Sequence, residues 1–470
     1  MKRQMFKWLG VFGVALAMNL GNQAMAQDDF ADEFAQEAEG SAQMAPLGLE
    51  FSGFLSFERT GRLDKNSDYE GDWLHNQTRL RLQTSKSNDL GSFNAKFDLV
   101  EDGVRKTSRV EIREAKITLT PIDWVDLNLG KQVNTWGVGD MLFINDLFPK
   151  NWNAMFLGQD MEFMKNPANS YRMSVYLGPL TWDLVSHPEF APDTTPNGCV
   201  LAVYNPNSLM DPDQPTIAQN SASCDQEPAA EVRNGGYDQG ELANRLKAQM
   251  GGFELAIYSY RGFYKNPQGM ALVDGELKPI YPRLETKGLS LEGQLGPGIL
   301  SMEAGAYDSK DDPEGVDPLI ANSVNKGLIG YRLDLSSHLM VGMQLYQEQM
   351  QDYDGYEAGI LGMYQQMGLT QAQAMEQAAY KYRREEVQNT HTLRLTFKAQ
   401  QDTLWINLFA YSRPEDRDSF YKLDITKRLN DQMQLVMGAN LFEGDENYPD
   451  REFGMLADQD NGFLRLQYNF

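Results

Sequence analysis

Apolar and polar side chains alternate along most of the chain. In residues 48–59, Leu49 and Phe51 fall on one face of an extended strand, whereas Glu50 and Ser52 fall on the other. Because successive side chains of a β-strand point to opposite faces, this period of two predicts strands with one apolar and one polar face. About 18 such strands are predicted, at residues 48–59, 74–86, 92–101, 109–120, 124–136, 168–178, 180–187, 239–250, 253–263, 283–295, 299–308, 323–335, 339–351, 387–399, 403–412, 419–427, 432–442 and 460–470. One missed or merged hairpin would change that number to about 16 or 20.

The connections between these strands alternate in length. Every second connection is a tight turn, and five of the others are much longer, at residues 137–167, 188–238, 264–281, 309–322 and 352–386. Turns therefore gather at one end of the sheet and long loops at the other. That is the plan of an all-β, transmembrane antiparallel β-barrel with short periplasmic turns and long extracellular loops. A secreted β-sandwich or propeller also alternates, but here the strands are long, the loops one-sided and no blade motif repeats.

The first 26 residues have the three parts of a secretory signal. Lys2 and Arg3 precede an apolar stretch, and Ala24 and Ala26 form a small-x-small cleavage site. We therefore expect a signal peptide at residues 1–26. An acidic segment without apolar periodicity follows, which predicts a flexible periplasmic segment at 27–47 and a barrel over 48–470.

Composition alone would suggest a soluble protein. Of the 470 residues, 41% are hydrophobic and the mean hydropathy is -0.50. A barrel can give such a value because the hydropathies of its polar lumen-facing residues and its apolar lipid-facing residues offset each other in the average. Beyond residue 26, no apolar stretch reaches the roughly 18 to 20 residues of a helical span. The net charge of -24 excludes non-specific nucleic-acid binding, since phosphate would repel it. Most of the acidic residues lie in the predicted loops and the 27–47 segment.

The last strand ends on an aromatic residue. Leu464, Leu466, Tyr468 and Phe470 share one face of it. This resembles the C-terminal signature of bacterial outer-membrane β-barrel transport proteins. The resemblance implies a location in the bacterial outer membrane, contact with membrane lipid and lipopolysaccharide, and recognition of Phe470 by the barrel-assembly machinery. Aromatic rings also form girdles at both membrane interfaces of such barrels, and the candidates here are Trp124, Tyr171, Trp182, Tyr411, Tyr468 and Phe470.

The connection at 137–167 is too apolar for an exposed loop. It includes Phe143, Ile144 and Phe156, which must be buried, and the inside of the barrel is the place available. The residues that lead into it are Gly130, Gln132, Trp136 and Gly137. In this stretch the sequence resembles bacterial porin-like proteins and exporters with an inward-folded third loop. The resemblance implies passive or facilitated passage of small polar or anionic solutes through a pore that this loop narrows.

Polar residues on the inner face, together with those of the 137–167 loop, are the candidates for contact with a solute. We expect the pore-lining and constriction residues to be Arg79, Arg81, Lys96, Lys131, Asn134, Asp140, Asp146, Arg172, Arg245, Lys247, Arg332, Arg394 and Lys398. Basic runs attract anions, and a wall of both signs orients dipolar solutes. Opposite charges on neighbouring strands can also pair only to make a polar wall. Both interpretations stay open.

Two cysteines, Cys199 and Cys224, lie in one loop. In an oxidising compartment they are expected to form one disulfide. No catalytic motif or metal-ligand spacing occurs in the sequence, so we expect no enzyme activity, no metal site and no cofactor. Residues 356–380 are rich in helix-forming residues and predict a helix at the extracellular end, either as a lid or packed at the barrel mouth.

Two other functions remain alternatives. One is the exit barrel of an export or lipid-trafficking system, which would bind a periplasmic partner through Phe30 and Phe34 in the 27–47 segment. The other is an adhesion or structural barrel that acts through its loops, above all residues 188–238.

Overall fold

A computed structural model describes residues 43–45, 49–63, 71–204, 217–218, 231–232, 240–273, 276–366, 368–377, 384–415, 417–444 and 452–470. Its main sheet has 19 strands: 18 that form the wall of a barrel and a short strand β1 (Gln43–Ala45). The wall consists of β2 (Leu49–Arg62), β3 (Trp73–Asn88), β4 (Gly91–Asp102), β5 (Thr107–Ile122), β6 (Val125–Gln132), β7 (Ala168–Leu177), β8 (Leu180–His187), β12 (Glu241–Met250), β13 (Phe253–Phe263), β16 (Arg283–Leu295), β17 (Gly298–Ser309), β18 (Val324–Ser336), β19 (Leu339–Met350), β20 (Val387–Ala399), β21 (Leu404–Arg413), β22 (Asp418–Arg428), β23 (Met433–Glu443) and β24 (Asn461–Asn469).

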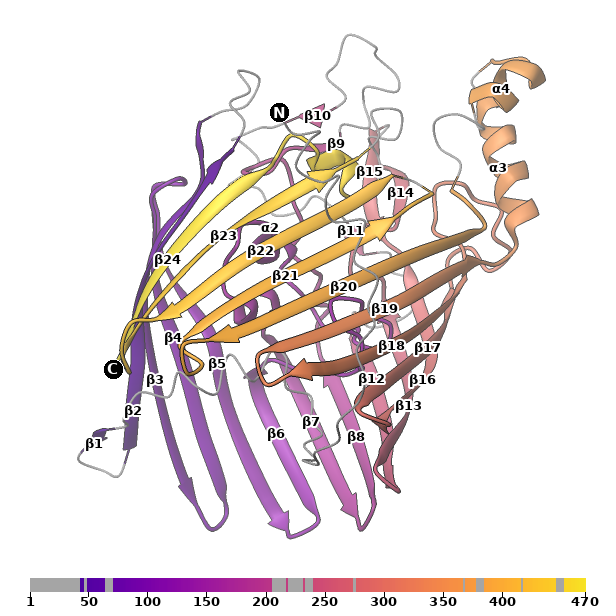
Figure 1. Ribbon diagram of the computed structural model, residues 1–470. Coiled ribbons are helices and arrows are strands. Elements are labelled where there is room, and N and C mark those ends of the chain that lie inside the picture. Colours follow the sequence, from indigo (N-terminus) through magenta and orange to yellow (C-terminus); the bar gives the residue numbers. More distant parts are fainter. Residues whose placement is uncertain are drawn as a thin grey trace.

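The barrel closes where its first and last strands meet. Every strand of the wall pairs antiparallel with its neighbours, and β2 pairs with both β3 and β24. At the seam, the main chains of Gly53 and Phe470 exchange two hydrogen bonds of 2.9 Å. Tight turns gather at one end and long connections at the other (Figure 1). The predicted fold class and strand number are therefore confirmed.

Alternation sets which side chains face lipid and which face inward. Leu82 and Phe97 lie opposite each other on β3 and β4, and both are exposed on the outer wall. The neighbouring pair, Arg81 on β3 and Asp98 on β4, also lies directly opposite across the two strands, but both side chains are buried in the interior. The outer wall thus offers apolar side chains to a bilayer, and the interior holds polar ones.

Five of the six girdle candidates are exposed, namely Trp124, Tyr171, Trp182, Tyr468 and Phe470. The prediction for Tyr411 is wrong. Its ring is buried inside the barrel, because it shares the inward face of β21 with Phe409, and its ring lies 4.9 Å from that of Phe453. Both faces of β21 carry apolar residues, so alternation alone does not show which face of this strand points inward.

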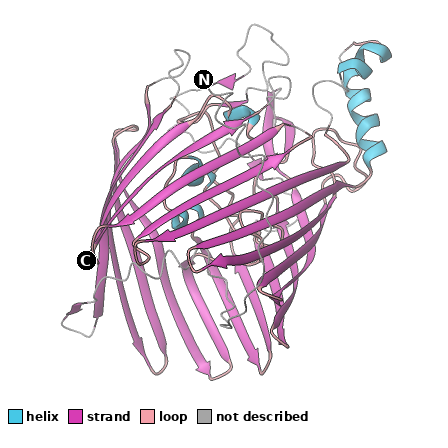
Figure 2. Ribbon diagram, in the orientation of Figure 1, coloured by secondary structure: helices cyan, strands magenta, loops and turns pink. Residues whose placement is uncertain are grey.

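The connection after β6, the third at the loop end, turns into the barrel. β6 ends at Gln132, four residues before the predicted boundary. Beyond it, Gly137 adopts a φ of 86°, a conformation that favours glycine, where the chain leads away from the strand. The segment that follows, residues 133–167, carries the helix α2 (Trp152–Phe156) and the 3-10 helix η3 (Met161–Met164). Figure 2 shows these helices inside the ring of strands. We call residues 133–167 the inner loop.

The remaining described elements lie at the loop end, apart from β1. They are β9 (Val203–Tyr204), β10 (Ile217–Ala218), β11 (Glu231–Val232), β14 (Gly269–Val273), β15 (Glu276–Tyr281), α3 (Tyr353–Gln366), α4 (Gln371–Gln377) and η7 (Gly454–Leu456). The predicted helix at residues 356–380 is present as α3 and α4, which stand at the rim to one side of the barrel (Figure 1). No helix in the described ranges is both long and apolar enough to cross a membrane.

Candidate functional site

The inner loop is buried against the barrel wall by its apolar residues. Ile144 is fully buried, and Phe148, Met155 and Phe156 are 3 to 5% exposed. They belong to one core that also contains Tyr307 and Phe420 of the wall. The apolar residues that looked out of place in an exposed loop are therefore buried in the lumen, as the sequence predicted.

A carboxylate of β17 holds the start of the inner loop. Glu303 accepts hydrogen bonds from the backbone N–H groups of Val138 and Gly139, both at 3.1 Å, and of Asn145 at 2.7 Å. Its side chain is 2% exposed. A carboxyl group has two oxygens that can accept several hydrogen bonds, so this one side chain fixes three points of the loop.

An ion pair between Arg394 of β20 and Asp140 holds the inner loop at a second place on the wall. Arg394 donates from Nη2 to Oδ1 of Asp140 over 2.7 Å and from Nε to Oδ2 over 2.5 Å. This bidentate geometry is the one that best orients a guanidinium and a carboxylate. The two predicted residues therefore meet, but they bind each other rather than standing free.

Helix α2 is held by aromatic rings of the wall and of the connection between β23 and β24. The ring of Phe156 lies 5.9 Å from that of Phe420, 5.7 Å from Phe442 and 6.1 Å from Phe453, edge to face in each case. Asn440 and Asn461 also donate to the Phe156 carbonyl, over 2.9 and 3.1 Å. Edge-to-face geometry suits the charge distribution of aromatic rings, so the helix is docked by packing and by hydrogen bonds.

The far end of the inner loop lies on the basic run of β3. Arg81 binds Asp98 through two nitrogens, at 2.7 and 2.8 Å, and also binds Glu162 of η3. Arg79 binds Asp98 at 2.6 Å and Glu111 at 2.7 Å. The basic run predicted to attract anions therefore faces inward and is largely paired with carboxylates.

Two cavities flank the inner loop. The first, which we call the vestibule, has a volume of about 550 Å³, and the second, the side cavity, about 580 Å³. A short partition separates them: residues 150–152 run beside residues 193–195, joined by Trp152 N to Thr194 O at 2.9 Å and Thr194 N to Lys150 O at 2.7 Å. Lys150 and Trp152 line the vestibule, whereas Asn151 and Thr194 line the side cavity.

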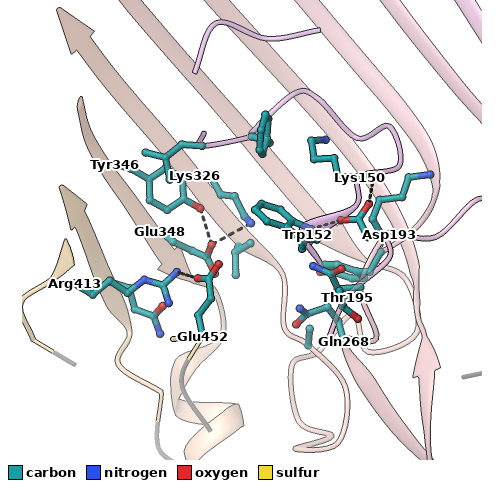
Figure 3. A pocket seen from close by; sticks show the side chains of 18 of the residues that line it. Lys150, Trp152, Asp193, Thr195, Gln268, Lys326, Tyr346, Glu348, Arg413 and Glu452 are labelled. Atoms are coloured by element: carbon teal, nitrogen blue, oxygen red, sulfur yellow. Dashed lines mark hydrogen bonds and ion pairs between the residues drawn. The ribbon is translucent and has the colours of Figure 1, made fainter. Parts of the chain in front are cut away.

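Polar pairs stand on two opposite sides of the vestibule (Figure 3). On one side, Glu348 accepts from Lys326 at 3.1 Å and Tyr346 at 2.8 Å, and Arg413 pairs with Glu452 at 3.0 Å. Because each carboxylate here has a basic partner, this side carries local dipoles with little net charge.

On the other side of the vestibule, Asp193 accepts from the Lys150 backbone N–H and from Trp152 Nε1, both at 2.8 Å. Burial raises the pKa of Asp193 above its ordinary value, even though Lys150 and these hydrogen bonds act to lower the pKa. This carboxylate joins the inner loop to the connection that follows β8.

A buried cluster connects the next loops to the wall. Glu241 of β12 accepts from His187 Nδ1 at 3.1 Å, and also from Tyr260 and Lys265. Lys265 donates in addition to the Ala191 carbonyl at 3.0 Å. The connections after β8 and β13 are therefore held at the barrel mouth by one carboxylate.

Most of the predicted site residues face the interior, and most of these are engaged with other side chains of the protein. Besides the pairs already described, the contacts are Lys96 with Glu114 at 3.5 Å, Arg172 and Arg245 with Asp183 at 2.9 and 2.8 Å, Lys247 with Glu254 at 3.1 Å, Asp146 with Lys150 at 3.3 Å, Asn134 with Ser170 at 3.0 Å, and Lys398 over the Trp405 ring at 4.1 Å. Lys131 lines the side cavity, and Arg332 lines a third cavity of about 60 Å³. Whether these residues contact a passing solute stays a prediction.

Sequence reasoning missed three features of the site. Glu303 was not among the predicted site residues, and the inward aromatic residues of β21 and β22 gave no signal in an alternating pattern. Arg113 was missed because strict alternation from Ile117 places it on the lipid side. A bulge in β5 turns it inward, since Lys96 pairs with Glu114 but Phe97 pairs with Ile112.

Cys199 is disulfide-bonded, whereas Cys224 lies outside the described residues. The pairing of these two cysteines therefore stays a prediction.

Comparison with known proteins gives similarity at the level of solved structures. No model of a known protein family matches the chain, and no curated protein matches it. The chain is similar to a triple mutant of the Rhodopseudomonas blastica porin, with 11% identity, 90% of this chain and 100% of that chain covered, and a TM-score of 0.39. A loop-deletion mutant of OmpT, an outer-membrane protein of Vibrio cholerae, has 9% identity, 90% and 99% coverage, and a TM-score of 0.40. OccK11 (OpdR) of Pseudomonas aeruginosa has 10% identity, 90% and 96% coverage, and a TM-score of 0.48. At scores below 0.5, these similarities do not by themselves establish a function.

Proposed function

We propose that this protein is a porin-like channel of the bacterial outer membrane. Small polar or anionic solutes would pass through its lumen by passive or facilitated diffusion, and the inner loop would narrow the pore. The observation that carries the proposal is the inner loop itself, which is tied to the inside of the wall and leaves a cavity on either side. A barrel of this strand number is wide enough for an aqueous channel unless side chains fill it.

The outer wall supports a membrane location. Ile257 and Leu289 lie opposite each other on neighbouring strands and are 57% and 50% exposed. Apolar side chains exposed in this way on strand after strand would be costly in water and favourable in lipid. Contact with lipopolysaccharide, and recognition of Phe470 by the barrel-assembly machinery, remain proposals that follow from this location.

The vestibule supports passage of polar solutes. Its charged lining residues are nearly balanced in sign: the acids are Asp146, Asp193, Glu348, Glu385, Glu386 and Glu452, and the bases are Lys150, Lys265, Lys326, Arg384 and Arg413. Paired charges on opposite sides of a narrow space orient dipolar and hydroxyl-rich solutes without trapping an ion of either sign. The predicted absence of enzyme activity stays a prediction.

Swelling of proteoliposomes tests the proposal. Vesicles that contain the wild-type protein should swell in small neutral sugars and amino acids and resist larger sugars. A variant that lacks residues 141–157 should admit larger solutes, because the loop that fills the lumen is gone. A Lys287→Gln variant, changed at an exposed side chain of β16, should match the wild type. Folded protein that gives no swelling in either the wild-type or the deleted form would contradict a channel function.

The other assignments have no described residue that favours them. Apart from Gln43–Ala45, the 27–47 segment and the 1–26 signal lie outside the described residues. The division into signal, acidic segment and barrel, the periplasmic partner of an export barrel, and the adhesion role of the 188–238 loop therefore stay predictions.

A further inference from the structure

The side cavity has a different charge from the vestibule. Five basic residues line it, Arg79, Arg105, Arg109, Arg113 and Lys131, against two acidic ones, Asp102 and Glu111. The space is of similar volume to the vestibule, where acids slightly outnumber bases. Positive charge that is concentrated along the walls of a cavity attracts anions more strongly than the same charge on a flat surface.

Arg113 is a buried cation that forms no ion pair with a carboxylate in the described part of the chain. It is 7% exposed. Its Nη2 donates to the backbone carbonyls of Glu162 at 3.0 Å and Lys165 at 2.7 Å, but its Nε has no hydrogen-bond partner in the described part of the chain. No ion pair of Arg113 occurs there either. A buried guanidinium that donates to backbone carbonyls and makes no direct ion pair is costly, so a ligand that supplied a directly bound negative charge would be bound favourably.

Arg79 adds a second guanidinium to the same lining. It is 3% exposed, and its Nη1 is taken by Asp98 and Glu111, while its unpartnered Nε is covered by protein atoms, so Arg79 contributes positive charge to the cavity wall rather than a free donor. Arg79 and Arg113 both pack on the ring of Phe163, with guanidinium carbons 4.2 and 5.3 Å from its centre. The ring therefore packs against both guanidinium groups and helps to place them along one wall of the cavity.

The partition gives this cavity its own lining. Asn151, Asn153 and Thr194 supply neutral polar groups to the side cavity, whereas their neighbours Lys150 and Trp152 line the vestibule. Residues of two extracellular connections, such as Val104 and Val200, also line the cavity. A ligand of the side cavity would therefore enter from the extracellular side and be held apart from solutes in the vestibule.

We propose that the side cavity is a binding site for a small oxyanion, bound by Arg113 and Arg79. The shared chemistry is a negatively charged group with two or more acceptor oxygens: sulfate, phosphate or a carboxylate. Arginine forks match such groups and bind them by charge-assisted hydrogen bonds. This site deepens the proposed channel function, because it assigns the anionic solutes a compartment beside the main route.

Calorimetric titration with sodium sulfate tests the site on the folded, detergent-solubilised barrel at low ionic strength. The wild-type protein should give saturable heat, and Arg113→Gln should bind at least about tenfold more weakly, because it loses the charge and the fork. Arg59→Gln, the same change at an exposed position of β2, should bind as the wild type does. No saturable heat from folded wild-type protein, or equal affinities of wild type and Arg113→Gln, would overturn the proposal.

A second pair of variants keeps the test independent of how Arg113 supports the inner loop. Val104 lies in the connection between β4 and β5 and lines the cavity. Val104→Glu should weaken sulfate binding relative to Val104→Gln, because only the first adds a negative charge; equal affinities would count against the site. Titration with inorganic phosphate and with acetate then separates the sources of the anion.

The outcome is separate from that of the proposed function, since calorimetry needs no current. A conducting channel that binds no sulfate would refute only the side-cavity site. A barrel that binds sulfate but passes no solute would refute only the channel.

Discussion

Single buried carboxylates hold the inner loop in the lumen. Glu303 gathers three backbone N–H groups at the start of the loop, and Asp193 joins the loop to the connection after β8. A carboxylate has two acceptor oxygens with room for several donors, so one residue can order a long irregular stretch of backbone. Backbone N–H groups that lose such an acceptor and remain buried are costly.

Replacing Glu303 with glutamine therefore tests the first of these anchors. Glu303→Gln keeps the size of the side chain but has one acceptor oxygen instead of two, so at least one loop N–H loses its partner. We expect a loss of about 1 to 3 kcal/mol in the free energy of unfolding, measured by urea titration in lipid vesicles. Glu101→Gln, at an exposed position of β4, is the matched control. Equal stabilities of the two variants would show that Glu303 does not hold the loop.

The raised pKa of Asp193 predicts a pH dependence with a definite sign. An acid whose pKa is higher in the folded protein than in the unfolded chain binds its proton more tightly when folded. Proton uptake therefore stabilises the folded loops as the pH falls from neutral through the raised pKa, and the ionised form is a cost at neutral pH.

Asp193→Asn, which cannot titrate, provides the reference for this effect. Relative to that variant, the wild-type protein should gain stability as the pH is lowered from neutral towards the ordinary range of aspartate. Unfolding free energies of both proteins over a pH series measure the difference. A difference that stays constant over the series would contradict the assignment.

At the level of elements, the strands could be predicted closely from the sequence, and the path of the inner loop could not. Alternation is local, so it locates strands and their faces within a residue or two in most of the wall. It fails at Arg113, where a bulge shifts the pattern by one residue, and at Phe409 and Tyr411, which are apolar on the inner face because the inner loop covers them.

The candidate site was predictable in part for the same reason. Inward-facing charges such as Arg81 and Arg394 follow from alternation, but their partners do not. Asp140 and Glu162 belong to an irregular segment whose docking depends on contacts across the whole lumen, and no periodic signal reports such contacts.

Helix α2 gives a test of docking by aromatic packing. Phe156→Ala removes the ring that meets Phe420, Phe442 and Phe453, and large-to-small changes of this kind cost about 3 to 5 kcal/mol. Hydrogen exchange of the backbone amides in residues 154–159 should become at least about tenfold faster, since 1.4 kcal/mol corresponds to a factor of ten. Phe97→Ala, on the outer wall, should leave these rates unchanged. Unchanged exchange in Phe156→Ala would mean that the rings do not hold the helix.

At the scale of the whole molecule, the barrel separates three environments. The outer wall is apolar, the vestibule has nearly balanced charge, and the side cavity is basic, although the chain as a whole carries a net charge of -24. Net charge therefore says little about what a solute would meet inside. The inner loop creates both compartments, since it divides a lumen that would otherwise be one wide space.

Single-channel recording in planar lipid bilayers tests the central claim most directly. The wild-type protein should insert and produce discrete conductance steps, and the variant without residues 141–157 should produce larger steps, because the loop no longer narrows the lumen. The claim that this barrel is a channel would be contradicted if neither form gave conductance steps, although heat-modified mobility and circular dichroism showed that both forms were folded.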